Sequence, residues 1–511
     1  MTQVSKIDST ATGLAYSEES SIGVLGGSPD WRSLKPNSYT DFGGELITTA
    51  PNPINPDRQQ EKGQSTDLNA GGQFNHDVTF YNLKHILQGL MFASEVSTGS
   101  ETVTAVDVDT TNPDEYEVAD TTGFLVGNLI KGFNFTNSEN NALNLVTVVT
   151  TNVSVEVGDG LLVDETPPSN AYIKVVGVQG AAGDIDVDVT GDYATYTSTT
   201  LDFTTLGLIP GQMIWVGGDT ASLGFSNAEN NGLKRIRSIA ANALVVDKSA
   251  SAMVTEASTT ETIQIFYGDT IKNELSASIV RRTYQLERLL GAPDDASPSQ
   301  IQTELLTGQV FNQMVLNIPT AALLQADLSF TGLDNSQRLA ATGPLQSSVT
   351  DPEEASVYNT SSDITSIKMA VHSTTSESTT ALFAYLTDLT LTINNNASVN
   401  KAIGTLGGFE VTVGNFQLSG SATAYFGNVT AVQAVRNNSD VTMDMLLAKE
   451  NQGIAIDIPL ISLGDGRLNV EIDRPITLPL SIDAARGAKI ASALDHTIMF
   501  NFFNYLPDAA L

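Results

Sequence analysis

The sequence predicts a mainly β protein with one clear amphipathic helix, and two observations lead to that prediction. Across most of the chain, Val, Ile, Thr and aromatic residues alternate with polar residues between clusters of Gly, Asn, Asp and Pro. This is the period of a half-buried strand. FQLSGSATAYF, which begins at Phe416, and IAIDIPL, which begins at Ile454, are two examples. The clearest helical period, by contrast, is confined to a single segment.

That segment is NLKHILQGLMFAS, whose apolar residues recur at offsets of three, four, seven and eight. The spacing places them in one stripe along a helix, which should lie against a sheet. Asn82 is the expected N-cap, and a shorter helix is expected over residues 429 to 436. The predicted core stripe consists of Leu83, Ile86, Leu87, Leu90 and Met91.

Length and composition describe an acidic globular protein. A chain of 511 residues is too long for one ordinary core, so two or three domains are expected. Hydrophobic residues make up 41% and charged residues 16%, which favours folded over disordered structure. The formal charge of −33 argues against a direct grip on phosphates. Solubility in general, or adaptation to salt, would explain the same charge.

Several classes of site and location are excluded or disfavoured. The chain has no cysteine, so it can form neither disulfides nor thiolate metal sites, and it has no cysteine nucleophile. No Gly-x-Ser-x-Gly, Walker or His-Glu-x-x-His motif occurs. The N-terminal segment does not resemble a signal peptide, and no apolar stretch approaches the roughly 20 residues of a membrane span. We therefore expect a soluble protein that is not an enzyme and needs no cofactor.

A polar segment precedes the main helix. Residues 48 to 72 are rich in Pro and Gly and have little to bury, so we expect a long loop, from 47 to 72, between two strands. Loops of this length in compact proteins are usually functional or disordered. This one is expected to reach a partner.

The middle of the chain contains an internal repeat. FTNSENNALNLVTVV from Phe135 matches FSNAENNGLKRIRSI from Phe225, and a Gly-x3-Gly turn with an apolar strand precedes each copy. We expect two small β modules, residues 102–195 and 196–268, inserted between core segments 1–101 and 269–511. Asn-Asn and Asn-Gly are expected to supply the positive φ angles of tight turns.

Few residues suggest chemistry. The four histidines, at positions 76, 85, 372 and 496, have no metal-ligand spacing, and each is expected to be hydrogen-bonded or solvated. Asp184, Asp186 and Asp188 alternate with apolar residues, so they could share a calcium ion on one strand face. A solvated strand face is the alternative, and the segment lacks the Gly and Glu of an EF-hand loop.

The order of segments resembles a known family. ESSIGVLGGSPDWRSLKPNS and PDRQQEKGQSTDLNAGGQFNHDVTFYNLKHILQGLM are similar to the N-terminal part of tail tube proteins from long, non-contractile phage tails. Those proteins have an early Gly-x-Pro-x-Trp strand, a polar loop with an Arg-Gln pair, here Arg58 and Gln59, and then an amphipathic helix. LTLTINNNASVNKAIGTLG, FQLSGSATAYFGNVTAVQAVRNNS and HTIMFNFFNYL resemble the C-terminal strands and short helix of the family.

The resemblance implies a structural role. The core would be a β-sandwich or half-open barrel with a flanking helix, and six copies would close into a hexameric ring whose joined sheets form a β-barrel around a lumen. The loop would contact the neighbouring ring, and an acidic lumen would let double-stranded DNA pass without specific binding. The expected contact residues are Asp57, Arg58, Gln59, Gln60, Glu61 and Lys62.

Further expectations follow from the same resemblance. The other partners would be a tape-measure protein and tail-end proteins, and the location would be the virion tail, assembled in the bacterial cytoplasm. The main alternative is a secreted acidic β-rich adhesin or surface-layer protein. An acidic polysaccharide hydrolase ranks third, and the repeat modules alone would also suit a capsid decoration or a baseplate component.

Overall fold

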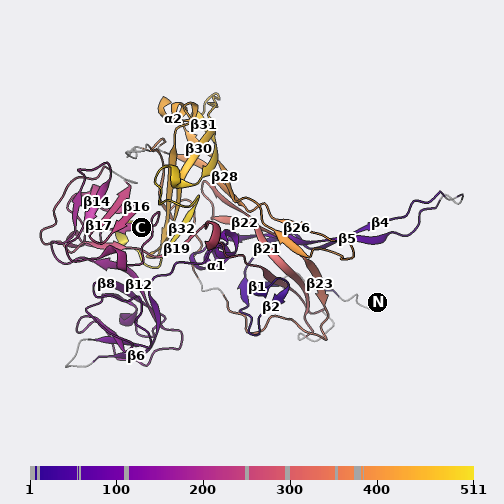
Figure 1. Cartoon of the computed structure of the whole chain (residues 1–511), viewed down its shortest axis with the longest axis horizontal. Coiled ribbons are helices and arrows are strands. Elements are labelled where there is room, and N and C mark those ends of the chain that lie inside the picture. Colours follow the sequence, from indigo (N-terminus) through magenta and orange to yellow (C-terminus); the bar gives the residue numbers. More distant parts are fainter. Residues whose placement is uncertain are drawn as a thin grey trace. The chain divides into compact units, whose positions relative to one another are not determined.

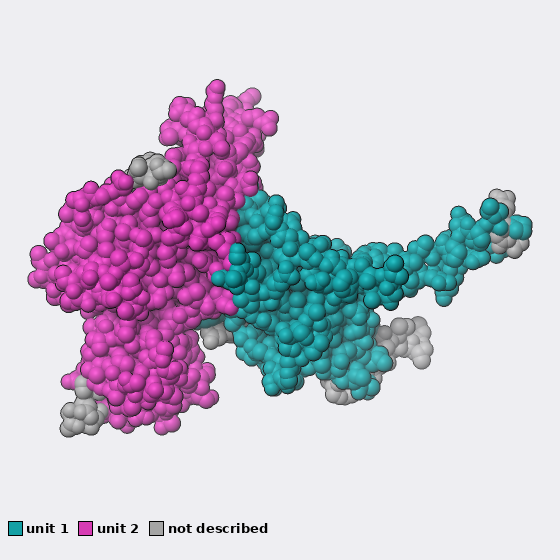
Figure 2. Space-filling model, viewed as in Figure 1, with its two compact units in different colours: residues 1–93, 276–358, 388–420 teal, residues 94–275, 359–387, 421–511 magenta. Residues whose placement is uncertain are grey.

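The computed structural model describes residues 6–7, 12–54, 56, 59–108, 114–247, 252–293, 300–351, 355–372, 381–383 and 385–511. It confirms the mainly β fold, with 47% of residues in strands and 9% in helices. The chain forms two compact units, coloured separately in Figure 2. Unit 1 comprises Met1–Ala93, Ser276–Tyr358 and Asp388–Gly420, and unit 2 comprises the rest. No helix in the described residues is long and apolar enough to span a membrane.

Unit 1 is an antiparallel sheet structure with one helix, α1 (Figure 1). The long strand β21 lies at its centre and pairs with β20, β22, β23 and β25. β22 in turn pairs with β5, and β5 pairs with β4. The elements are β1 (Gly13–Ser21), β2 (Val24–Leu25), β3 (Arg32–Leu34), β4 (Ser38–Thr49), β5 (Gln64–Asp77), α1 (Phe80–Met91), β20 (Tyr284–Gly291), β21 (Gln302–Pro319), β22 (Gln325–Gly332), β23 (Asp334–Arg338), β25 (Leu386–Asn394), β26 (Ser398–Asn400) and β27 (Glu410–Thr412).

The N-cap of helix α1 lies three residues earlier than the predicted Asn82. Thr79 is the N-cap, and its side chain accepts a hydrogen bond from the Asn82 backbone N–H while the Asn82 side chain accepts one from the Thr79 backbone. Asn82 is therefore the third-residue partner in a capping box, not the cap itself. The predicted apolar stripe is buried in full: Leu83, Ile86, Leu87, Leu90 and Met91.

The predicted loop from 47 to 72 is mostly a β-hairpin, which we call the arm. β4 continues to Thr49 and β5 begins at Gln64, so only residues 50–63 form the connection. The arm extends away from the rest of unit 1 (Figures 1 and 2). Sequence periodicity missed these strands because β4 and the first residues of β5 are mostly exposed on both faces and therefore lack apolar alternation.

Unit 2 combines a second set of core strands with the repeat modules. β29 pairs with β24 and β30, and β30 pairs with β31 and β32. The helix α2 lies where the sequence predicts it, although Ala431 and Ala434 form its buried face. The core elements are β19 (Asp269–Lys272), β24 (Ile364–Val371), α2 (Val429–Arg436), β29 (Val441–Lys449), β30 (Gln452–Asp465), β31 (Thr477–Ala485) and β32 (Met499–Phe503), while β28 (Gln417–Tyr425) spans the division between the units.

Two modules of similar construction occupy residues 100–179 (module 1) and 180–267 (module 2). They share one apolar core, and β12 of module 1 pairs with β18 of module 2. The expected division at 195/196 falls inside β14, which pairs with β13 and β17 of module 2. The strands are β6 (Ser100–Asp107), β7 (Glu115–Val118), β8 (Asn128–Phe133), β9 (Leu143–Leu145), β10 (Val148–Thr150), β11 (Ser154–Glu156), β12 (Tyr172–Gln179), β13 (Asp186–Asp188), β14 (Ala194–Thr197), β15 (Met213–Val216), β16 (Gly232–Ala240), β17 (Ala243–Asp247) and β18 (Gln264–Phe266).

Candidate assembly surface

The arm offers an exposed strand edge. In the described residues β4 pairs only with β5, and most of its side chains are exposed, including Leu46 at 51% and Ile47 at 39%. Such an edge presents unpaired backbone donors and acceptors, which another chain can satisfy. The arm therefore has the features of a binding element: it buries little within its own unit and can form a sheet with a partner.

The tip of the arm carries most of the expected contact residues. Gln59, Gln60, Glu61 and Lys62 are exposed and lie outside the strands. Asp57 and Arg58 lie outside the described residues. The tip segment is thus accessible in the chain, as a contact between rings would require.

Glycines shape the base of the arm, where β4 bulges between Thr40 and Gly43. A Cβ on Gly71 would lie 2.6 Å from the Phe330 carbonyl oxygen, and a Cβ on Gly72 would lie 2.6 Å from the Phe42 Cα. Only glycine permits such close backbone approach. The bulge borders a hollow of about 700 Å³ lined by residues 41–45, 69–73 and 329–331.

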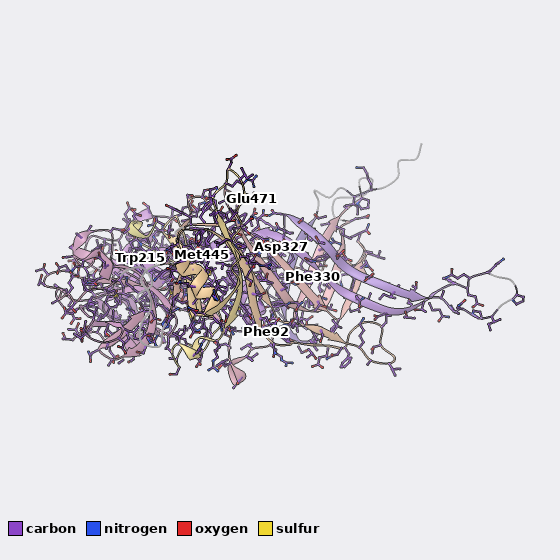
Figure 3. The ribbon with its side chains drawn as sticks, turned by 90° about the horizontal axis from the view of Figure 1, so that it is seen from above. Phe92, Trp215, Asp327, Phe330, Met445 and Glu471 are labelled. Carbon is purple, nitrogen blue, oxygen red and sulfur yellow. The ribbon has the colours of Figure 1, made fainter. Side chains whose placement is uncertain are left out.

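Aromatic and charged side chains stabilise this base. Phe42 packs edge-on against Phe330 of β22, with ring centroids 5.4 Å apart (Figure 3 labels Phe330). The Arg288 guanidinium lies 4.5 Å from the Phe42 ring centroid and pairs with Glu304. A cation over an aromatic face stabilises by roughly 0.5–2 kcal/mol, so the bulge is held in one arrangement.

A lysine fixes the adjacent part of β5. Lys401 Nζ lies 2.5 Å from an Asp67 carboxylate oxygen and 2.7 Å from the Asn69 amide oxygen. This hydrogen bond is the main cause that lowers the pKa of Asp67 below its ordinary value. The segment that carries Lys401 therefore braces β5 near the point where the arm leaves the sheet.

The repeat is a pair of carboxylate-centred turns. In module 1, Glu165 accepts hydrogen bonds from the backbone N–H groups of Thr136 and Asn137 and from the side-chain amides of Asn137 and Asn140. Burial raises the pKa of Glu165, but these hydrogen bonds outweigh burial, so the pKa is lowered overall. Glu256 makes the same set of bonds in module 2, to Ser226, Asn227 and Asn230.

Of the Asn-Asn and Asn-Gly pairs of the repeat, the Asn-Gly pair of module 2 contains a positive φ angle, at Gly232, whereas the asparagines themselves do not. Asn141 instead bonds through its side chain to the Phe135 N–H and carbonyl, and Asn231 does the same to Phe225. Positive φ angles occur at the glycines of both Gly-x3-Gly turns: Gly123, Gly127, Gly207 and Gly211. The repeat is therefore a duplicated structural scaffold.

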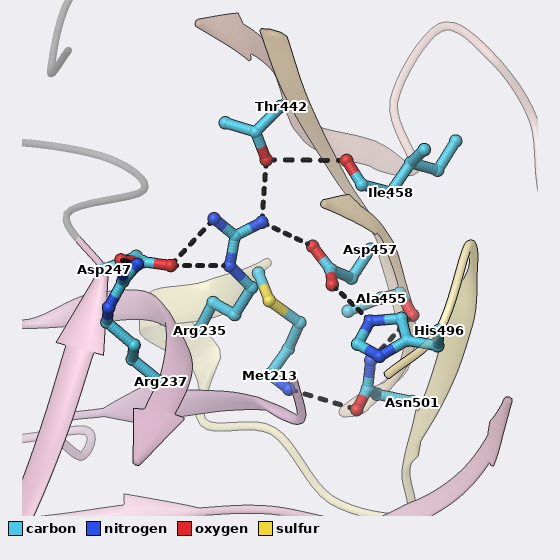
Figure 4. A network of polar contacts seen from close by, with 10 residues as sticks. All are labelled: Met213, Arg235, Arg237, Asp247, Thr442, Ala455, Asp457, Ile458, His496 and Asn501. Atoms are coloured by element: carbon cyan, nitrogen blue, oxygen red, sulfur yellow. Dashed lines mark hydrogen bonds and ion pairs between the residues drawn. The ribbon is translucent and has the colours of Figure 1, made fainter. Parts of the chain in front are cut away.

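Module 2 is joined to the core strands of unit 2 by a buried ion network (Figure 4). Arg235 pairs with Asp247 at 2.8 Å and with Asp457 of β30 at 3.0 Å, and it also donates to the Thr442 hydroxyl. His496 donates to the second Asp457 oxygen at 2.9 Å. Met213, Leu233 and Trp215 of module 2 also pack in one apolar cluster with Phe503 and Leu506.

Comparison with known families decides the class of protein. The sequence model described as phage tail tube protein matches residues 9–169 and 174–484. The chain belongs to this family. No curated protein matches the sequence significantly. The match includes most of both modules as well as the core, and it supports the recognition made from the order of segments.

The three aspartates of the proposed calcium site in this tail tube protein do not converge. Asp184 is buried and accepts hydrogen bonds from Ser198, Thr199 and Thr200, whereas Asp186 bonds to Ser258 and Asp188 to Thr190. Only Asp186 and Asp188 lie in β13. Alternation was thus a poor guide here, because the strand begins after Asp184 and the chain turns before it.

Asp184 is the most strongly perturbed of these carboxyls. Burial raises its pKa, but hydrogen bonds from Ser198, Thr199 and Thr200 prevail and lower the pKa to about 2. A different acidic group, Asp107, Glu115 and Glu117, has carboxylates within 4.8 Å of one another on the described surface of module 1. Exposed acidic groups of this kind are common without an ion.

The histidines of the tail tube protein play structural roles. His76 donates to the Asp77 carbonyl, and burial lowers its pKa. His85 accepts from Arg32, and burial followed by the Arg32 charge lowers its pKa to about 4. His372 stacks on Tyr193, and its ring nitrogens have no hydrogen-bond partner in the described residues, which differs from the expectation of a bonded or solvated histidine.

Sequence reasoning missed three groups of functional residues. Gly71 and Gly72 were visible but were assigned to a loop, and Gly43 and Gly44, which precede that loop, were assigned no role. The Arg235 network was not visible, because Thr442 and Asp457 lie more than 200 positions from Arg235 in the sequence. The acidic hubs, Glu165 and Glu256, could have been found, since each follows its copy of the repeat at nearly the same spacing.

Proposed function

We propose that this tail tube subunit forms rings that stack into a hollow tube, and that the phage genome passes through the lumen during ejection. Family membership supports the structural role. The unpartnered arm is the observation that supports assembly, because a twelve-residue strand with a free edge and exposed apolar side chains gains little from folding alone. The subunit would act mechanically and catalyse no reaction.

Charge supports the role of a conduit. With a formal charge of −33 per chain, any acidic surface that faces the lumen repels DNA phosphates. The repulsion acts within a Debye length of the wall, about 8 Å at physiological salt. It would therefore prevent adhesion of the duplex without holding it at the axis.

The remaining partners follow from the same proposal. A tape-measure protein would occupy the lumen before DNA does, and tail-end proteins would bind the terminal rings. The subunit would assemble in the cytoplasm of the bacterial host and act in the virion tail. In each ring, six copies of the tube fold would surround the lumen, with their sheets joined into one β-barrel. The arm would contact the next ring through Gln59, Gln60, Glu61, Lys62 and neighbouring tip residues.

Electron microscopy of the purified protein tests assembly. We expect uniform hollow rods or rings in negative stain at high protein concentration. Monodisperse monomers that never assemble would contradict the proposal. A secreted adhesin, the alternative from sequence, would give such monomers.

Shortening the arm tests its role in stacking. Thr49 and Gln64 are paired at the end of the strands, so residues 50–63 can be replaced by Asn-Gly, which closes a two-residue hairpin. We expect a folded subunit, seen as an unchanged circular dichroism spectrum, that forms rings without rods. A second variant, in which residues 50–63 are replaced by a Gly/Ser segment of the same length, keeps the length of the arm but removes its side-chain contacts. Rods of normal length from the shortened variant would exclude the arm as the stacking element.

A further inference from the structure

The core of this chain contains one arrangement of strands and helix twice. Block A (residues 38–91 and 284–332) consists of the hairpin β4–β5, then α1, then β20, β21 and β22. Its strands pair in the order β4, β5, β22, β21, β20, and every pairing is antiparallel. The two modules are inserted after its helix.

Block B (residues 386–485) repeats this order without an insertion after its helix, and the short strands β26 and β27 lie in the connection between its first two strands. The strands β25 and β28 form a hairpin, in which the Tyr425 N–H donates to the Tyr385 carbonyl and the Thr387 hydroxyl to the Thr423 carbonyl. α2 follows, and then β29, β30 and β31. β28 pairs with β31, β31 with β30, and β30 with β29, which is the order seen in block A.

Two details make coincidence a poor explanation. Each helix starts directly after the second hairpin strand and is capped by a side chain, Thr79 in block A and Asn428 in block B. The long strand of each block also changes partner part-way. β21 pairs first with β20 and then with β22, and β30 pairs first with β29 and then with β31.

Block B is joined to block A by strand pairing. β25, its first strand, pairs antiparallel with β21 over Gln313–Pro319. β22 and β23 pair with one edge of β21, so β20 and β25 share the other edge. β20 occupies the part of this edge that comes before β25 along β21. The hairpin of one block thus continues the sheet of the other where β20 ends.

The two equivalent strand edges, one on the hairpin of block A and one on the long strand of block B, have no pairing partner in the described residues. β4 corresponds to β25 and has no partner but β5 in the described residues. β30 corresponds to β21, and its β29-side edge is unpaired in the described residues after Ile461. Beyond β30, Leu468, Val470 and Ile472 alternate as in a strand, yet they are 41%, 68% and 91% exposed (Figure 3 labels the intervening Glu471).

We propose that β4 of one chain pairs antiparallel with residues 462–472 of a second copy, as β25 pairs with β21 within a chain. This inference rests on the proposed tube function. Because each chain supplies two blocks, three chains close a ring of six blocks, in place of the six chains that the family resemblance implied. The resulting ring has threefold symmetry with six similar positions.

The pairing removes two exposed edges at once. Leu46 and Ile47 on β4 and the exposed apolar side chains after β30 would each gain a neighbouring strand. Cross-strand side-chain pairs stabilise a sheet, and closure into a ring leaves no free edge for uncontrolled aggregation. The proposed pairing also explains why the segment after β30 lacks strand structure in the single chain, because the strand that it would pair with belongs to another copy.

Symmetry of the assembled rods is the first test. Electron cryo-microscopy of rods from the full chain should give rings with threefold symmetry and three chains each. Native mass spectrometry of rings from the arm-shortened variant should give three chain masses. Rods with six chains per ring would overturn this inference and leave the tube function standing, whereas absence of any ring or rod would contradict the tube function itself.

Cross-linking tests the pairing directly, and the lack of native cysteine removes background. Glu45→Cys is combined in turn with Ser462→Cys, Arg467→Cys and Asn469→Cys, and assembled rods are oxidised. We expect at least one pair to give a covalent ladder that ends at three chains. The single-cysteine variants serve as controls and should stay monomeric on a denaturing gel. No ladder from any pair in well-formed rods, or a ladder that reaches six chains, would overturn the proposal.

Discussion

At the scale of single residues, carboxylates that are half-buried or buried organise the turns of both modules. Glu165 and Glu256 each gather backbone and amide N–H groups that would otherwise lie unpaired beside the protein core. Asp184 does the same for a turn in module 2. Hydrogen bonds to an ionised acceptor are stronger than neutral ones, so the negative charges of these three residues have a structural role.

Asp184→Asn should destabilise module 2 in a pH-dependent way. The amide cannot accept the full set of hydrogen bonds, and we expect a loss of about 2 kcal/mol at neutral pH. Because the folded-state pKa is lowered to about 2 from an ordinary 3.8, the wild-type advantage is present above pH 4 and disappears as the pH falls through 2. Thermal melts of both proteins between pH 7 and pH 2 measure this difference. Asp188→Asn, at an exposed site, is the matched control, and an equal effect there would contradict the assignment.

At the scale of elements, helix α1 depends on one close approach. A Cβ on Gly89 would lie 2.5 Å from the Tyr284 hydroxyl oxygen and 2.6 Å from its ring. Alanine is the better helix former, yet Gly89→Ala should destabilise the protein by about 1–3 kcal/mol through overpacking. Gly427→Ala, where no atom lies within 4 Å of the added Cβ, is the control. Chemical denaturation measures both, and a stabilised Gly89→Ala variant would show that β20 can move away from the helix.

Elements that bury one face were predictable from the sequence, and those defined by distant partners were not. The stripe of α1 and the bounds of α2 follow from helical period and caps. The strands of the arm were mistaken for a loop, because β4 and the first residues of β5 are mostly exposed on both faces and so have no apolar period. Alternation placed Asp184 on a strand, although its hydrogen bonds to Ser198 and Thr200 hold it in a turn.

At the scale of the whole molecule, the modules are part of the core of unit 2. The chain enters and leaves them side by side, since Val96 and Thr270 exchange backbone hydrogen bonds. Adjacent entry and exit points are typical of an inserted domain that folds independently of its host. However, Arg235 supplies the buried charge opposite Asp457, and Met213 and Leu233 cover Phe503. Because the modules supply these buried contacts, the sequence of the core strands depends on their presence.

Removal of both modules should therefore destabilise the remaining core. Joining Gly99 to Gly268 is geometrically simple, but it leaves Asp457 buried without its arginine and exposes Phe503 and Leu506. Breaking a buried ion pair from one side costs about 3–5 kcal/mol, so the deletion variant should melt well below the full chain. Adding Asp457→Asn to the deletion should recover part of the loss, because the neutral amide needs no counter-charge.

Arg235→Leu in the full chain isolates the ionic contribution, since the apolar cover of Phe503 stays in place. We expect a loss of about 3–5 kcal/mol in chemical denaturation. Arg467→Leu, which removes an exposed pair with Asp465, should change the unfolding free energy by less than about 1 kcal/mol. If the module deletion melts at the same temperature as the full chain, the modules are independent of the tube core, and the buried network has no role in holding unit 2 together.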